Sequence, residues 1–228
     1  MQNLLLLHGA LGAAAQFAPL QEQLEKHFTL HTLNFAGHGG EPFPQGGYSI
    51  QVFAQNVLDY LDQQGIEQID IFGYSMGGYV ALYLAQQHPD RIGKIYTLAT
   101  KFAWSPESAE QEMKMLNPEK IAEKVPKFAA ALEQRHAPQD WKEVLNQTAA
   151  MMRGLGEAPL LTEEGLEAIP HTCLITVGDQ DQMVSREETM AAANTLPKAE
   201  FACMAETPHP LEQVNVERLA KWIREFMS

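Results

Sequence analysis

Short apolar runs alternate along the chain with amphipathic stretches. The six runs are Leu4–Leu7, Phe28–Phe35, Ile69–Phe72, Lys94–Ala99, Thr172–Val177 and Glu200–Met204. The stretches between them follow a helical period and predict helices over Ala14–His27, Ile50–Gln64, Met76–Gln87, Ser185–Thr195 and Pro210–Met227. Brief strands that are apolar on both faces and alternate with helices are typical of a parallel sheet covered on each side. The pattern therefore predicts an α/β fold with a mostly parallel, six-stranded sheet.

The region 101–169 breaks this alternation, because it has helical segments but no convincing strand. We expect residues 1–100 and 170–228 to form one core, with 101–169 inserted between two of its strands. Proline-containing helix starts occur at Ser105-Pro106, Asn117-Pro118 and Ala137-Pro138. Pro126 is expected to bend or split the second of these helices, and the third is expected to end near Gly154 and Gly156.

Methionines concentrate in this insertion, at Met113, Met115, Met151 and Met152. Methionine-rich helices form adaptable apolar surfaces. Such a surface fits either a satellite core or a lid over an apolar pocket, and the periodicity alone does not choose between them.

Composition narrows the class of partners. The chain has 228 residues, 45% of them hydrophobic and 20% charged, which is typical of one globular domain. Its formal charge of -13 makes nucleic acids and anionic membranes poor partners.

Two cysteines are too few for a disulfide scaffold or a zinc motif, and we expect both to be buried thiols. No stretch is long enough to span a membrane and no basic leader precedes Leu4, so we expect a cytoplasmic protein. The oligomeric state is left open.

The segment Gly73-Tyr74-Ser75-Met76-Gly77 is the first candidate for chemistry. It follows the apolar run Ile69–Phe72 and precedes a helix with almost no polar residues. A serine on a tight turn between a strand and a helix has its hydroxyl exposed at the edge of the sheet, and the strained turn requires small neighbours. Ser75 is therefore a candidate nucleophile.

A serine hydroxyl needs a base to take its proton. His209 is the candidate, since it lies in a loop after the last apolar run and the flanking Pro208 and Pro210 restrict its backbone. The other histidines have simpler explanations. We expect His27, His31, His88 and His136 to be solvated at helix ends or on polar faces.

A carboxylate should orient that base. Gly178-Asp179-Gln180-Asp181 follows the strand Thr172–Val177 and offers two candidates. Asp179 directly follows the turn glycine and could simply bind local backbone amides. Asp181 has room to reach the histidine, so we prefer Asp181 and keep Asp179 as the alternative.

Two backbone donors are needed for the developing oxyanion. One should be the amide of Met76 at the start of its helix. The other should come from the loop His8-Gly9-Ala10-Leu11-Gly12, where Ala10 is the first choice and Leu11 the second. We expect His8 to brace this loop by hydrogen bonds.

Together these features resemble the α/β-hydrolase family over essentially the whole chain. The matching segments are Leu4–Gly9 with its loop, Gly37-His38-Gly39, Gly73–Gly77, Val177–Asp181 and His209. The resemblance implies a parallel sheet with helices on both faces and an active site beneath a helical lid. It assigns the insertion to that lid, which makes its methionines candidates for the pocket lining. We expect Leu11, Met113, Met151 and Met183 to bind substrate.

Departures from the family narrow this expectation. The chain begins on the strand that carries His-Gly, so we expect six strands and not the longer sheet of many relatives. Asn34 and Gly40 replace residues that are often aspartate and serine, which affects only the pocket edge. Ser75 at the elbow argues against dehalogenases and epoxide hydrolases, which need a carboxylate nucleophile. Tyr79 stands where menaquinone-pathway relatives carry arginine, which argues against the non-hydrolytic activity of those relatives.

The sequence thus predicts a serine hydrolase for small or medium carboxylic esters or thioesters, with a small-molecule acyl substrate and no metal or organic cofactor. Two alternatives use the same scaffold. One is a hydrolase or lyase that cleaves a carbon–carbon bond with the same triad. The other is a receptor that keeps the pocket without turnover.

Overall fold

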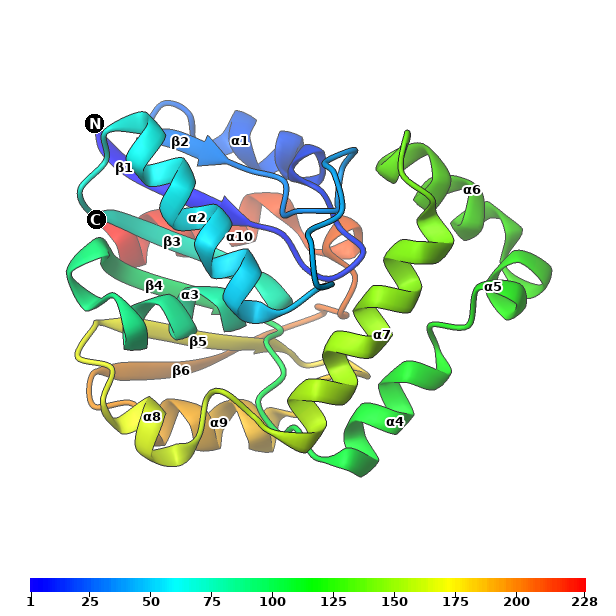
Figure 1. The fold of residues 1–228 in the computed structure, drawn as a ribbon. Helices are drawn as coiled ribbons and strands as arrows, with labels where there is room; N and C mark the ends of the chain where they lie inside the picture. Colours follow the sequence, from blue (N-terminus) through cyan, green and yellow to red (C-terminus); the bar gives the residue numbers. More distant parts are fainter.

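A computed structural model describes all residues 1–228, and its centre is a six-stranded sheet (Figure 1). Every neighbouring pair of strands is parallel, and the order across the sheet is β2-β1-β3-β4-β5-β6. The predicted fold class, strand number and order of elements are therefore confirmed. The strand bounds are β1 Gln2–Leu7, β2 Phe28–Thr32, β3 Ile69–Tyr74, β4 Ile92–Leu98, β5 Cys173–Gly178 and β6 Ala199–Met204.

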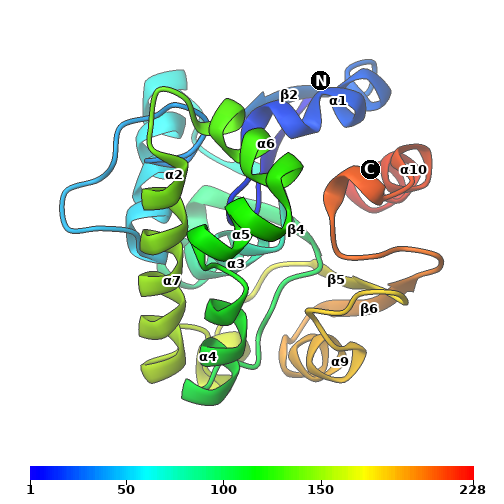
Figure 2. The same ribbon diagram turned by 90° about the vertical axis from the view of Figure 1, so that its right-hand side faces the viewer.

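Alternate side chains of each strand enter two different cores. In β1, Leu4 and Leu6 pack with helices α1 (Ala18–Leu24) and α10 (Val216–Met227) on one face of the sheet. Leu5 and Leu7 point to the opposite face, which is covered by α2 (Ile50–Gln64), α3 (Met76–Gln87) and α9 (Arg186–Thr195). Figure 2 shows these two helical layers on either side of the sheet. The period of two in a strand thus gives each face its own apolar layer.

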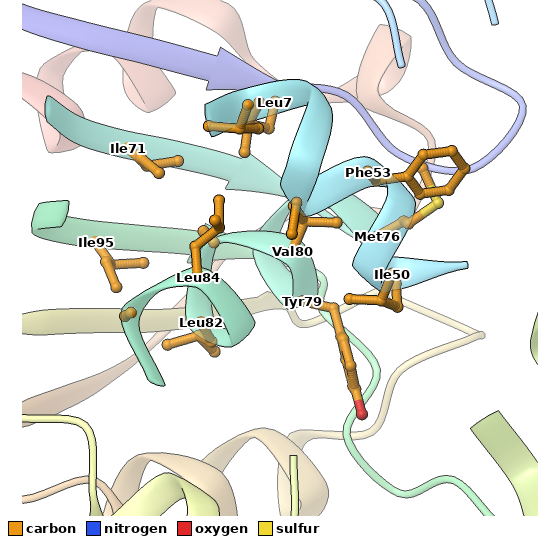
Figure 3. Close-up of a cluster of buried hydrophobic side chains, with 14 of the residues drawn as sticks. Leu7, Ile50, Phe53, Ile71, Met76, Tyr79, Val80, Leu82, Leu84 and Ile95 are labelled. Atoms are coloured by element: carbon orange, nitrogen blue, oxygen red, sulfur yellow. The ribbon is translucent and has the colours of Figure 1, made fainter. Parts of the chain in front are cut away.

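Helix α3 is the most buried helix of the core. Its residues from Met76 to Leu82 are all buried, and they pack against strands β1, β3 and β4 and against α2. Figure 3 shows Leu84 near Ile71 and Ile95 of the sheet, with Tyr79 extending away from them. This helix has no solvated face, which explains the near absence of polar residues in its sequence.

The inserted helices lie beyond the carboxyl ends of the strands (Figure 1). They are α4 Pro106–Lys114, α5 Pro118–Lys124, α6 Pro126–His136 and α7 Trp141–Glu157. A fifth short helix, α8 Glu163–Glu167, packs against α3 and α9. No helix of the chain is both long and apolar enough to cross a lipid bilayer.

The local sequence signals set most of the bounds in the insertion. Ser105 and Asn117 cap α4 and α5 through their side chains, and Pro126 separates α5 from α6. The start of α7 was wrongly predicted at Ala137-Pro138. The helix begins at Trp141 instead, because the side chain of Asp140 accepts the amide of Lys142 and forms the cap.

Three predicted elements of the core are shorter than their apolar patterns. Residues 14–17 form a 3-10 turn before α1, and residues 211–213 form another before α10. The side chain of Asn215 accepts the amide of Arg218 and therefore fixes the start of α10. Strand β2 ends at Thr32, since the next residues turn toward the ring of His8.

Gly78 marks the closest approach of α3 to the sheet. A methyl group at this position would overlap the hydroxyl oxygen of Thr100 and would lie 3.0 Å from the carbonyl oxygen of Gly73. Gly73 in turn faces the backbone of Gly78 and has no room for a side chain. The pair of glycines lets the helix start directly above the end of β3.

We expect Gly78→Ala to lower the free energy of unfolding by about 1–3 kcal/mol, because the added methyl group must displace Thr100 or the helix. Gly154→Ala on the exposed face of α7 is the matched control, since nothing lies within 4 Å of its added methyl group. It should raise the free energy of unfolding by about 0.5–1 kcal/mol through helix propensity. Urea unfolding of both variants measures the difference, and equal effects would contradict the close approach.

Candidate active site

Ser75 lies on the turn between β3 and α3 in a conformation that is strained for a residue with a side chain. Its φ of 51° and ψ of −116° lie outside the regions that such residues ordinarily adopt. The backbone around it is held firmly. Its amide donates to the carbonyl of Leu98 at 2.8 Å, and its carbonyl accepts the Thr100 hydroxyl at 2.9 Å. The side chain caps no helix amide, so the hydroxyl is left for other use.

His209 is held both at its imidazole ring and at its backbone. Its Nδ1 lies 2.8 Å from Oδ2 of Asp181. The Tyr74 hydroxyl donates to the His209 carbonyl at 2.8 Å, and the two rings lie with centroids 5.7 Å apart. The hydrogen bond to the carboxylate places the proton on Nδ1 and leaves Nε2 as the basic nitrogen.

The Asp181 side chain is completely buried, and both of its oxygens have donors. Oδ1 accepts the amides of Met183 and Val184 at 2.8 and 2.9 Å, while Oδ2 accepts the imidazole. These backbone donors stabilise a buried carboxylate and hold it in one orientation. Asp179 instead accepts the amide of Thr207 at 3.1 Å and lies exposed on the turn. It is therefore Asp181 that contacts His209.

Two residues that line the cavity with Ser75 have backbone amides without an acceptor. Met76 is the first residue of α3, so its amide has no acceptor within the helix. Ala10 follows His8 and Gly9 in the loop after β1, and its amide donates no hydrogen bond. Both residues line the same cavity as Ser75 and His209. The residues of the cavity wall therefore include two with unpaired backbone donors.

The buried ring of His8 holds the loop that carries Ala10. Its Nδ1 donates to the carbonyl of Gly9 at 2.8 Å, and its Nε2 accepts the amide of Phe35 at 3.2 Å. Burial lowers the pKa of His8 to about 4 and outweighs the hydrogen bond to Gly9, which favours the charged form. The neutral ring therefore serves as a brace, as the sequence predicts.

His136 was wrongly predicted to be solvated, since it is fully buried at the end of α6. Its Nε2 donates to the carbonyl of Leu11 at 3.1 Å, and its Nδ1 accepts the amide of Gly39 at 3.1 Å. Arg135 donates to the same Leu11 carbonyl at 2.8 Å. The end of α6 turns inward onto the loop after β1. The helical period cannot show this, because Gly39 and Leu11 lie 97 and 125 residues from His136 in sequence. Burial lowers the pKa of His136 to about 4.

The cavity over Ser75 is mainly apolar, with one polar end. Its apolar wall includes Ile50, Tyr79, Met151, Met152, Leu155, Met183 and Val184. Met151 and Met183 thus lie where the sequence predicts. Met113 and Leu11 do not line it. On α4 it is the neighbouring Glu112 that points inward, and the Leu11 side chain packs against the apolar cluster of the insertion.

The polar end consists of Lys101, Trp104 and Glu112, none of which was predicted from the sequence. Lys101 Nζ lies 3.3 Å from Oε1 of Glu112 and 5.7 Å from the Trp104 ring centroid. A Lys or Glu in a helical segment ordinarily marks a solvated face. The sequence held one signal for this polar end. Lys101 closely follows a strand, and the other site residues also lie at the carboxyl ends of strands.

Comparison with known proteins decides the family. The sequence model of the α/β-hydrolase fold matches residues 2–209, which is most of the chain.

The chain belongs to the α/β-hydrolase family.

Among curated relatives, this α/β hydrolase is similar to a Caulobacter segnis protein provisionally named carbamate hydrolase RutD. The two are 25% identical over 98% of this chain and 90% of the relative. It is also 35% identical to the pimeloyl-[acyl-carrier protein] methyl ester esterase of Vibrio vulnificus, over 44% of this chain and 38% of the esterase. Among solved structures, a thermophilic esterase from Thermogutta terrifontis superposes with a TM-score of 0.80 at 24% identity, covering 100% of this chain and 89% of that one. The relatives are hydrolases, and the chain is accordingly an enzyme of this family.

No group of three or more histidine, cysteine, aspartate or glutamate side chains in the hydrolase is placed to share a metal ion. The clustered rings of His8, His38 and His136 bond backbone groups instead.

The buried histidines predict how stability depends on pH. Both His8 and His136 have folded pKa values of about 4, against an ordinary value of 6.5. Between these values the unfolded chain takes up protons that the folded hydrolase does not, so the free energy of unfolding should fall as pH falls from 6.5 to 4. For fully buried His8 the loss is up to about 3 kcal/mol.

Urea unfolding between pH 7 and pH 4 measures this dependence. His136→Gln should show a shallower loss than the wild type, because one neutral buried ring is gone. The exposed His27→Gln is the control and should keep the wild-type slope. An unchanged slope in His136→Gln would contradict the neutral state of this ring.

Proposed function

We propose that this α/β hydrolase cleaves small or medium carboxylic esters or thioesters through an acyl-enzyme on Ser75. The observation that carries the proposal is the shared cavity. Ser75 on its strained turn and His209 on the Asp181 carboxylate both line it. The ester hydrolase from Vibrio vulnificus, at 35% identity over part of the chain, supports the choice of substrate class.

In the proposed reaction, the Ser75 oxygen attacks the acyl carbon while Nε2 of His209 accepts its proton. The carbonyl π electrons move to the oxygen, and the amides of Ala10 and Met76 donate hydrogen bonds to the oxyanion. The tetrahedral species collapses, and His209 gives its proton to the departing alcohol or thiol. Asp181 stabilises the imidazolium formed in between.

Water then completes the cycle. His209 takes a proton from a water molecule, whose oxygen attacks the acyl carbon of the ester on Ser75. The second tetrahedral species releases the carboxylic acid and returns the proton from His209 to the Ser75 oxygen. The Ser75 hydroxyl and His209 make no hydrogen bond in the free protein, and in such enzymes this contact commonly tightens only when substrate is bound.

We further propose that residues 101–169 act as the lid of this site. Helices α4 and α7 supply Glu112, Met151, Met152 and Leu155 to the cavity wall. The Tyr79 hydroxyl accepts the amides of Leu160 and Leu161 at 3.1 and 3.0 Å, so the chain after α7 is fastened to the core. An apolar roof excludes water from the acyl group and strengthens the hydrogen bonds to the oxyanion.

Ser75→Ala should lower kcat on short p-nitrophenyl esters roughly 10⁶-fold, because the nucleophile is lost. A fluorophosphonate should add one phosphonyl group to the wild type and none to the variant, as measured by intact mass. Labelling of Ser75 without turnover of any ester would redirect the proposal toward carbon–carbon bond cleavage. Absence of labelling would indicate a receptor.

Asp181→Asn should lower kcat about 10⁴-fold, because the amide no longer holds the required imidazole tautomer. Asp179→Asn keeps the oxygen that accepts the Thr207 amide, so it should retain most of the activity. Steady-state kinetics of the two variants at one pH provide the comparison. Equal losses would show that the orienting acid has been assigned to the wrong residue.

A further inference from the structure

The polar end of the cavity has hydrogen-bonding groups without partners. The indole Nε1 of Trp104 is a buried donor with no acceptor in the protein. Oε2 of Glu112 is a buried acceptor with no donor, on a side chain that is only 9% exposed. Both residues line the cavity that holds Ser75. An unpaired polar atom out of water costs free energy, so a partner from the bound molecule is favoured at this point.

The charges at this end are already balanced. Lys101 Nζ lies 3.3 Å from Oε1 of Glu112 and also donates to the carbonyl of Met183 at 3.4 Å. A carboxylate on the substrate would meet the second oxygen of Glu112, and an ammonium would meet Lys101. A neutral group that both donates and accepts hydrogen bonds can satisfy Trp104 and Glu112 without disturbing the ion pair.

We propose that Trp104 and Glu112 form a subsite for a neutral polar group of the substrate that is both donor and acceptor, such as a carboxamide or an alcohol. Trp104 donates to its oxygen, and Glu112 accepts its N–H or O–H. Lys101 holds Glu112 with Oε2 toward the cavity. This deepens the proposed function, on which it rests for the nature of the scissile bond.

Carboxamide and methyl ketone ends provide the test, because they have nearly the same shape and differ in the donor. The acyl series consists of p-nitrophenyl esters of one chain length that end in a carboxamide, a methyl ketone, an ethyl group or a carboxylate. A second series carries the same ends on the alcohol part of butanoate esters, so that either orientation of the substrate is covered.

In the wild type, kcat/KM for the carboxamide should exceed that for the ketone by about tenfold or more in one series, since the ketone leaves the Glu112 oxygen unpaired. Glu112→Gln can still accept from Lys101 but presents an N–H to the cavity. The ratio of carboxamide to ketone should therefore fall to about one. Trp104→Phe should lower kcat/KM for the carboxamide and for the ketone relative to that for the ethyl end, because the N–H that donates to either carbonyl is gone.

Glu110→Gln is the matched control, since it makes the same change on the exposed face of α4. It should keep the wild-type ratio, and melting temperatures report whether each variant is folded. A wild-type ratio near one in both series, with the esters turned over, would overturn the subsite and leave Glu112 as a structural partner of Lys101.

Failure of the proposed function gives a different result, namely no turnover of any ester. The same compounds are therefore also titrated by calorimetry into Ser75→Ala protein. A lower Kd for the carboxamide than for the ketone, lost in Ser75→Ala/Glu112→Gln, supports the subsite even without ester hydrolysis. Equal Kd values, or no binding of either compound, would overturn it.

Discussion

The backbone turn at Ser75 is the constraint on which the site depends. A residue with a side chain adopts its φ of 51° only where the surroundings enforce it. Enforcement comes from β3 behind it, from the strand partner Leu98 and from the Thr100 hydroxyl. The glycines at 73 and 78 remove the side chains that would prevent helix α3 from starting there. The same turn leaves the serine hydroxyl and the Met76 amide beside one cavity.

Much of the fold and the main residues of the candidate site could be predicted, because both follow local rules. Parallel strands end at one edge of the sheet, so residues just after the apolar runs meet there. Ser75 and Asp181 follow β3 and β5 in this way, and His209 lies a few residues beyond β6. Asp181 could be preferred to Asp179 because a residue directly after the turn glycine has little room to reach the histidine. Asp179 accepts the amide of Thr207 in the loop after β6, and not an amide of its own loop.

Features that depend on packing between distant segments could not be predicted. The burial of His136 results from contacts with Leu11 and Gly39, which no local pattern encodes. Residues 112 and 113 are neighbours on α4, and the helix rotation that turns the glutamate and not the methionine into the cavity is set by packing against α7. The buried ion pair of Lys101 and Glu112 could not be predicted either, because in the sequence it looks the same as a pair on a solvated surface.

The carbonyl of Leu11 links the insertion to the loop that carries Ala10. Arg135 and His136 at the end of α6 both donate to it, so this loop is shaped partly by residues outside the core. Helical insertions are attractive segments to exchange between related enzymes in order to change selectivity. In this chain such a chimera would lose two donors that hold the loop after β1, together with the residues of the insertion that line the cavity. A transplanted segment would have to bring equivalent donors to the Leu11 carbonyl. Without them the recipient would gain a new pocket, but the loop that carries Ala10 would be less firmly held.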